Sequence, residues 1–155
     1  WRGTSMEEMG NLRARLDAML QSQRLAVLST AGAGGAPYSN LVSFAALGTG
    51  RLLFATTRAT RKYANLTADA RVALLVDNRR GQEADFHEAL AATALGSAVE
   101  LAGEERDRGI AAYTAKFPFL EEFVRAPSCA LFRVDVERWI VVTRFQNVIE
   151  VSPLP

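Results

Sequence analysis

Apolar residues in the first part of the chain recur at the three- and four-residue spacing of a helix. They are Met9, Leu12, Leu16, Met19 and Leu20. This spacing places all five on one side of a helix, so we expect residues 7–21 to form an amphipathic helix that packs against the rest of the protein.

The pattern then changes to short β-prone runs divided by glycine-rich turns. Four such runs cover residues 25–29, 38–46, 51–56 and 71–77. Glycine-rich turns at 32–35 and 48–50 predict hairpins between the first three runs. The interval 59–67 places its apolar residues on one face and predicts a short helix between the third run and the fourth.

The second half of the chain continues with strands and adds helices. A run of small residues over 89–101 predicts a long strand, and residues 104–117 predict a helix that Pro118 ends. Further segments are a short helical turn at 119–124, alternating runs at 129–136 and 138–145 that form a strand pair or one long bent strand, and an edge strand at 148–151. Residues 78–88 are polar and have no periodicity, which predicts a long mobile loop.

These elements predict a mainly β (α+β) protein, a six- to seven-stranded antiparallel split β-barrel with peripheral helices. Barrel closure leaves few exposed sheet edges. The 155 residues fit a single domain, which we expect to span residues 6–155. Tryptophan cannot initiate a chain, so we expect residues 1–5, ahead of Met6, to be an appended segment.

Three cations fall where a predicted strand gives way to the first turn of a helix. They are Arg58, Arg61 and Lys62. A helix N-terminus carries the positive end of the helix dipole and several unpaired N–H groups, so cations there are unfavourable unless an anion binds among them. A phosphate satisfies the cations and the N–H groups together. The alternative is a solvated basic turn whose long side chains point into water.

Two blocks of sequence resemble the FMN-binding split barrels of the pyridoxamine 5'-phosphate oxidase superfamily. The first block is Gly35 to Ala45, and the second runs from Phe54 through Lys62 to Leu75. Both keep the spacing of that family without a gap. The resemblance extends over roughly residues 24–77 and is weaker beyond them.

The resemblance implies FMN as the cofactor and assigns residues to it. In the family, the backbone of the first block lines the flavin ring, and the second block holds the phosphate. The implied ring positions are Asn40, Leu41, Val42, Ser43, Ala45, Ala55 and Thr56, and the implied phosphate positions are Thr60, Arg61 and Lys62. A family aromatic near the end of the barrel approaches the flavin, which points to Trp139, although a strand tryptophan is more often a core residue.

The chain departs from the vitamin-processing oxidases of this superfamily at charged positions. Asn40 and Ala45 stand where those enzymes carry an arginine and a lysine, and residues 138–145 do not reproduce their substrate-phosphate signature of arginine and histidine. A cation near the pyrimidine edge stabilises the anionic reduced flavin, so its loss should alter the redox poise. Pyridoxamine phosphate is therefore a poor candidate substrate.

The leading functional interpretation is an FMN-dependent oxidoreductase of unassigned substrate, in which the flavin carries the redox chemistry. No catalytic side chain and no metal site are assigned. The alternatives are a non-catalytic flavin-binding or sensing module, a haem-binding or haem-degrading relative, and a deazaflavin user. Haem usually requires an axial ligand, and His87 is the one histidine in the sequence.

Charge and composition restrict the partners. The formal net charge is +1, so no global field attracts nucleic acid, and no apolar stretch has the length of a membrane span. The single cysteine, Cys129, cannot form an internal disulfide, which is typical of a reducing cytoplasm. The resemblance implies a homodimer in which two protomers close each flavin site, with Trp139 and the strand at residues 91–93 reaching the flavin of the partner.

Overall fold

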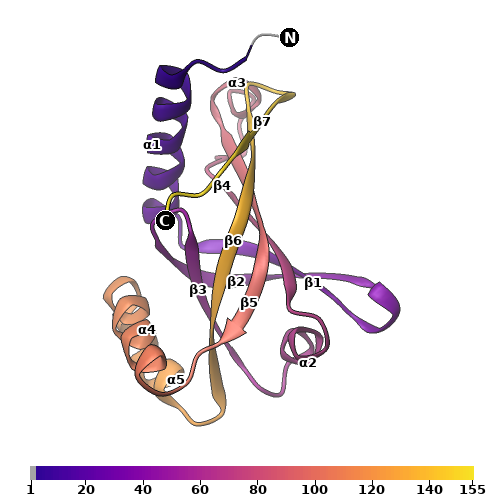
Figure 1. Ribbon diagram of the computed structural model, residues 1–155, viewed down its shortest axis with the longest axis vertical. Helices are drawn as coiled ribbons and strands as arrows, with labels where there is room; N and C mark the ends of the chain where they lie inside the picture. The colour runs from indigo at the N-terminus through magenta and orange to yellow at the C-terminus, as the bar shows by residue number, and fades with distance from the viewer. Residues whose placement is uncertain (1–2) are drawn as a thin grey trace.

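A seven-stranded antiparallel sheet forms the body of the protein (Figure 1). The structure is a computed structural model that describes residues 3–155, so the expectation for Trp1 and Arg2 lies outside the described residues. The strands are β1 (Leu25–Ala31), β2 (Pro37–Leu47), β3 (Arg51–Thr57), β4 (Arg71–Asp77), β5 (Leu90–Glu100), β6 (Cys129–Thr143) and β7 (Asn147–Val151). Their order is β3-β2-β1-β4-β5-β6-β7, and pairing of β3 with β6 closes six of them into a barrel. The predicted fold class is confirmed.

Five helices surround the barrel (Figure 1). They are α1 (Met6–Ser22), α2 (Arg61–Ala68), α3 (Asp85–Glu88), α4 (Gly103–Lys116) and α5 (Glu121–Arg125), with 3-10 turns η1 (Ala33–Gly35) and η2 (Pro118–Leu120). A capping box begins α1, because the Ser5 side chain accepts from the Glu8 N–H and the Glu8 carboxylate accepts from the Ser5 N–H. The helices predicted at 7–21, 59–67 and 104–117 are all present within about two residues at each end.

Two segments differ in detail from the sequence pattern. Residues 129–143 form one strand of 15 residues, which selects the single long strand over a strand pair. A bulge between Leu95 and Gly96 shifts the register of β5 against β6. A Cβ atom at Gly96 would lie 2.1 Å from the Asp135 carbonyl oxygen, so only glycine allows this close approach.

The predicted loop of residues 78–88 is built around one carboxylate. Asp85 begins α3, and its side chain accepts the backbone N–H groups of Arg80, Gly81 and Gln82 at 2.7–3.0 Å. These bonds hold the pKa of Asp85 below its usual value, chiefly through the Gln82 and Arg80 N–H groups. The predicted loop is present over residues 78–84, whereas residues 85–88 form the short helix α3 instead. The Asp85 carboxylate organises this loop because it accepts several backbone N–H groups.

Two apolar clusters stabilise the fold. The larger one fills the barrel and includes Phe44, Phe54, Leu74 and Trp139, with the apolar face of α1 packed on it. The smaller one lies outside the barrel, where residues of α4 such as Tyr113 cover β3 and the end of β2. Burial of these side chains is the main stabilising contribution to the fold.

β2 and β3 diverge along their length. They pair only over residues 44–47 and 51–54. Beyond that point, residues 40–43 of β2 pair with β1 alone, and residues 55–57 of β3 pair with β6 alone. Among the described strands, these two facing stretches are therefore not bonded to each other, and this opening is the split in the barrel.

Candidate cofactor site

The helix α2 begins beside the split, at the end of β3. Thr60 is its N-cap residue, and the Thr60 hydroxyl accepts from the Tyr63 N–H at 3.3 Å. The same hydroxyl lies 2.9 Å from the Thr56 hydroxyl and donates to the Thr57 carbonyl at 3.0 Å. Side chains of the strand and the turn thus fix the start of α2.

Arg61 and Lys62 occupy the first turn of α2, where the helix dipole is positive. Within residues 3–155, no carboxylate lies within 4.0 Å of either side chain. The Arg61 guanidinium lies 5.5 Å from the centre of the Tyr38 ring, which orients it by a cation–π contact. Lys62 is half-buried, and desolvation by burial lowers its pKa. The positive end of the helix dipole and the desolvated ammonium group of Lys62 both favour a bound anion here, and the side chains of residues 3–155 supply no carboxylate for it.

Arg58 does not belong to this cation pair. Its guanidinium donates to the carbonyl oxygens of Pro127 at 2.6 Å and Cys129 at 3.0 Å, and to the Glu100 carboxylate at 2.9 Å. Arg58 therefore ties the end of β3 to β5 and to the start of β6. The expectation that one phosphate satisfies all three cations is corrected, because Glu100 already neutralises Arg58.

The strand residues predicted to line the ring meet at the split, with their side chains on different sides. Asn40, Leu41 and Ser43 have side chains that are wholly or partly exposed, and Leu41 is 63% exposed. Val42 faces the barrel core, and Ala45 is covered by the α4 cluster. Only the backbone of Val42 and Ala45 can therefore face a ligand, in agreement with the role that the resemblance implies.

Asn40 has one unsatisfied polar atom. Its amide nitrogen donates to the Leu41 carbonyl at 3.2 Å, whereas its side-chain oxygen is buried and has no hydrogen-bond partner among the described residues. A buried acceptor without a partner is costly, so a donor supplied by a ligand would stabilise it. On the β3 side, Ala55 is half-buried and Thr56 is buried.

Trp139 lies apart from these residues. It is fully buried inside the barrel, and its indole N–H donates to the Thr49 carbonyl at 2.8 Å. Among the implied cofactor residues, the side chains of Val42, Ala45 and Thr56 are also buried, but Trp139 alone is fully buried, at 0% exposure. Its environment matches the core interpretation of this residue.

The residues present fit a ligand that combines a flat ring with a phosphate. Within residues 3–155, two cations without carboxylate partners lie at the start of a helix, the adjoining strands are unpaired across the split, and the Asn40 side-chain oxygen has no hydrogen-bond donor. Sequence reasoning missed Tyr38, which orients Arg61, because nothing local in the sequence signals that the β1–β2 hairpin comes close to α2.

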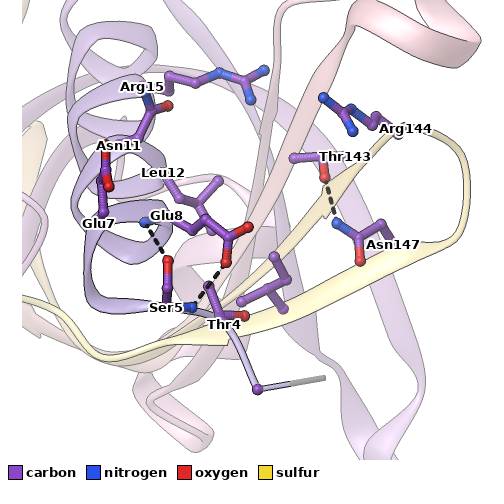
Figure 2. A pocket seen from close by; sticks show the side chains of 12 residues that line it. Thr4, Ser5, Glu7, Glu8, Asn11, Leu12, Arg15, Thr143, Arg144 and Asn147 are labelled. Carbon is purple, nitrogen blue, oxygen red and sulfur yellow. Dashed lines mark hydrogen bonds between the residues drawn. The ribbon is translucent and has the colours of Figure 1, made fainter. Parts of the chain in front are cut away.

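Two hollows lie elsewhere on the molecule. The first, of about 660 Å³, separates the start of α1 from the turn between β6 and β7. Figure 2 shows Arg15 and Arg144 on its two sides and the hydrogen bond from Asn147 to the Thr143 hydroxyl, which is 2.9 Å long. The second, of about 670 Å³, lies under the loop of residues 78–88. Neither hollow is lined by Arg61 or Lys62.

Comparisons with known proteins identify the family and support the fold. The family model described as pyridoxamine 5'-phosphate oxidase matches residues 12–143. No curated protein matches the sequence.

In residues 3–155, no helix is both long enough and apolar enough to cross a membrane.

Several solved structures share the fold. A haem-binding protein from Mycobacterium smegmatis has a TM-score of 0.78 and 18% identity; the match covers 90% of this chain and 56% of that one. A Clostridium acetobutylicum protein related to general stress protein 26 has a TM-score of 0.71 and 13% identity; the match covers 92% of this chain and 94% of that one. A FAD-binding protein from Mesorhizobium loti has a TM-score of 0.64 and 18% identity; the match covers 83% of this chain and 90% of that one.

Proposed function

The chain belongs to the pyridoxamine 5'-phosphate oxidase family, and from this premise we propose that it is an FMN-binding protein that works as a flavin-dependent oxidoreductase. The observation that carries the proposal is the pair Arg61 and Lys62 at the start of α2, which has no carboxylate partner within residues 3–155. A phosphate monoester supplies the missing negative charge at the positive end of the helix dipole.

In this proposal, the chain binds and orients the cofactor. Thr60, Arg61 and Lys62 would hold the phosphate, while the backbones of residues 40–43 and 55–56 would lie along the ring. The bound flavin would supply hydride or electron transfer. The protein's own contribution is binding, exclusion of water from the ring and the electrostatics around it, and no side chain is required to act as an acid or a base.

The substrate differs from that of the vitamin-processing oxidases. The positions where those enzymes are expected to carry cations hold Asn40 and Ala45. The Ala45 side chain is buried in the apolar cluster that also contains Tyr113 of α4. A second phosphate over the flavin would therefore find no cation at either position. We therefore expect an uncharged or weakly charged substrate to bind more tightly than a doubly charged one.

We also propose that the flavin sites are shared within a homodimer. A row of mostly apolar side chains crosses the outer face of the sheet; it consists of Leu41, Val27, Leu75, Thr93 and Ile140, which follow one another in register from strand to strand. All five are exposed or partly exposed. A second copy would bury this row, and the two-fold arrangement is the commonest solution. Light scattering on the wild type and on Leu75→Glu tests the dimer, and a monomeric wild type at micromolar concentration would contradict it.

Haem is the second candidate, because a protein with this fold is described as haem-binding. His87 is exposed on α3 and is the only imidazole available as an axial ligand. Two further alternatives are that the protein uses a deazaflavin in place of FMN, and that it binds flavin without catalysing a reaction. The absorption spectrum of the protein as purified separates flavin, deazaflavin and haem directly.

Titration with FMN and with riboflavin tests the phosphate site itself. The two ligands share the ring and differ by the phosphate, so we expect much tighter binding of FMN. Two charge-assisted contacts of about 1.5–3 kcal/mol each carry this difference. Equal affinity for the two ligands would contradict the proposed phosphate site. Turnover with a nicotinamide donor would then separate an enzyme from a binding module.

A further inference from the structure

Two arginines without a carboxylate partner face the first hollow from opposite sides. Arg15 belongs to α1, and Arg144 begins the turn between β6 and β7. Figure 2 shows their guanidinium groups pointing toward one another across the hollow. Within residues 3–155, no carboxylate oxygen lies within 4.0 Å of either guanidinium group. Two like charges that face one space repel each other, and an anion bound between them removes this repulsion.

The turn that carries Arg144 has an unfavourable backbone conformation. Arg144, Phe145 and Gln146 have φ angles of 43°, 35° and 74°. Three consecutive non-glycine residues in the left-handed region persist only where the surroundings determine them. The Asn147 side chain closes this turn by donating to the Thr143 hydroxyl at 2.9 Å. The backbone of Arg144 is therefore held at the edge of the hollow.

The other end of the hollow is acidic. Glu7 and Glu8 line it in the first turn of α1, about two helical turns before Arg15. The Glu8 carboxylate accepts the Ser5 N–H at 2.8 Å. Hydrogen bonds from Ser5, chiefly from its backbone, lower the pKa of Glu8, so this carboxylate stays charged near neutral pH. The hollow therefore has a cationic end and an anionic end.

The wall between these two ends is partly apolar. Leu12 of α1 and Ile149 of β7 line it. The cavity of about 660 Å³ lies within the usual range of about 300–1,000 Å³ for small-molecule sites. Opposite charges at the two ends, with apolar side chains between them, suit a short aliphatic chain that carries opposite charges at its own two ends.

The hollow lies on the inner side of the sheet, opposite the row of side chains proposed for the dimer. Val141 is buried in the barrel core. Thr143 and Ile149 lie on the same side of the sheet as Val141, because Thr143 is two positions further along β6 and Ile149 pairs with Val141. Ile140, which belongs to the dimer row, points to the opposite side. None of the residues implied for the flavin lines the hollow, so a ligand here would be separate from the flavin and from the dimer interface.

We propose that this cavity, the Arg15–Arg144 pocket, is a binding site for a short zwitterion that carries a carboxylate and an amino group on an aliphatic chain. The carboxylate would lie between the two guanidinium groups, whose parallel N–H groups match its two oxygens. The chain would contact Leu12 and Ile149, and the ammonium group would lie beside Glu8. The rise of about 10 Å between Glu8 and Arg15 along α1, less two contacts of about 3 Å each, leaves about 4 Å between the two charges of the ligand.

An NMR chemical-shift titration of the protein with four small compounds tests the pocket. 4-Aminobutanoate carries both charges at about the required separation, and it should bind and shift the amide signals of residues 11–15 and 143–147. Butanoate lacks the ammonium group and butylamine lacks the carboxylate, so each should bind about three- to tenfold more weakly, as expected for the loss of one partly exposed ion pair. Glycine carries both charges on one carbon atom, cannot reach both ends and should be similarly weak.

Charge variants test each end of the pocket separately. Arg15→Gln and Arg144→Gln should each weaken 4-aminobutanoate binding by about three- to tenfold. The control is Arg108→Gln, because Arg108 is exposed on α4 and does not line the pocket; it should leave binding unchanged. Glu8→Gln removes a negative charge but keeps a residue that can complete the capping box, so it should narrow the difference between 4-aminobutanoate and butanoate.

A filling variant tests where the ligand binds. Asn11 is exposed on α1 and lines the pocket, so Asn11→Trp should abolish 4-aminobutanoate binding without disturbing the core. Arg61→Ala with Lys62→Ala should leave it unchanged, even if it abolishes FMN binding. Circular dichroism and urea unfolding establish that each variant is folded.

Three results would overturn the proposal. The first is that 4-aminobutanoate does not bind, or binds no more tightly than butanoate and butylamine. The second is that binding survives Asn11→Trp. The third is that Arg15→Gln and Arg144→Gln weaken binding no more than the control Arg108→Gln does.

Discussion

The hydroxyl groups of Thr56 and Thr60 lie 2.9 Å apart and join the end of β3 to the N-cap of α2. We expect Thr60→Ala to lower the free energy of unfolding by about 0.5–2 kcal/mol, the usual cost of losing an N-cap. It should also weaken FMN binding, because the start of α2 is no longer fixed. Thr60→Ser keeps the hydroxyl and serves as the control. Urea unfolding and FMN titration measure the two effects, and an unchanged stability would show that the cap does not contribute.

Arg61→Ala and Lys62→Ala should each weaken FMN binding by roughly 10- to 150-fold, which corresponds to about 1.5–3 kcal/mol per charge-assisted contact. Riboflavin binding should stay unchanged, because it has no phosphate. Arg71→Ala is a suitable control: Arg71 is paired with Asp69 at the far end of the same helix. Isothermal titration of both ligands measures the effect, and an equal loss of riboflavin affinity would mean that the ring site had been damaged instead.

The sequence contains two lysines, Lys62 and Lys116, so lysine-selective 13C labelling yields two side-chain signals that can be titrated separately. Burial lowers the pKa of both amines, that of Lys116 to about 8. FMN should raise the pKa of Lys62, because the phosphate dianion stabilises the ammonium form, and should leave Lys116 unchanged. A Lys62 signal that does not respond to FMN would contradict direct contact with the phosphate.

Lys116 also predicts a dependence of stability on pH. Its pKa is about 8 in the folded protein, against an ordinary value of 10.5. Between these pH values the unfolded chain binds more protons than the folded protein, so the contribution of Lys116 to the free energy of unfolding increases as the pH rises. Lys116→Met should remove this part of the pH dependence. Urea unfolding of both proteins from pH 8 to 10 measures it, and identical slopes would contradict the prediction.

Trp139→Phe should lower the free energy of unfolding by about 2–4 kcal/mol, because it leaves a cavity in the barrel and a Thr49 carbonyl without its donor. FMN affinity should change less than twofold, since the indole is fully buried. The opposite result, weaker FMN binding at nearly unchanged stability, would restore Trp139 as a flavin contact.

Pyridoxine 5'-phosphate should not be oxidised at an appreciable rate by FMN-saturated protein. Asn40 and Ala45 provide no cation for its phosphate, and removal of a phosphate dianion from water without a cationic partner is unfavourable. Release of hydrogen peroxide under air measures the reaction. Turnover near the typical enzyme value of about 10 per second would show that these two positions do not determine the substrate.

The strands and the start of α2 could be predicted from the sequence because their signals are local. Alternation of side chains, glycine turns and the Thr60 cap each depend on a few neighbouring residues. Contacts between strands that are distant in the sequence could not be predicted in this way. Arg58 meets Glu100, 42 positions away, only because the ends of β3, β5 and β6 come together, and no local pattern indicates this contact.

The direction of individual side chains was the least predictable part of the site. Ala45 and Trp139 lie in strands that were predicted correctly, yet α4 covers the first and the barrel encloses the second. The contact between the rings of Phe86 and Phe145 had no sequence signal either, since it requires a turn in the left-handed conformation and a loop folded around Asp85.

Because the barrel closes by the pairing of β3 with β6, it cannot close during synthesis until β6 has left the ribosome. β6 begins roughly 70 residues after β3 ends, so at about 5–20 residues per second its synthesis follows that of β3 by roughly 4–14 s. During that interval the edge of β3 that later pairs with β6 is open, while residues 51–54 can pair with β2 on the other edge. Thr60, Arg61 and Lys62 of the proposed phosphate site are therefore synthesised several seconds before the barrel can close. A chaperone that binds the open edge of β3 during this interval would protect it from aggregation.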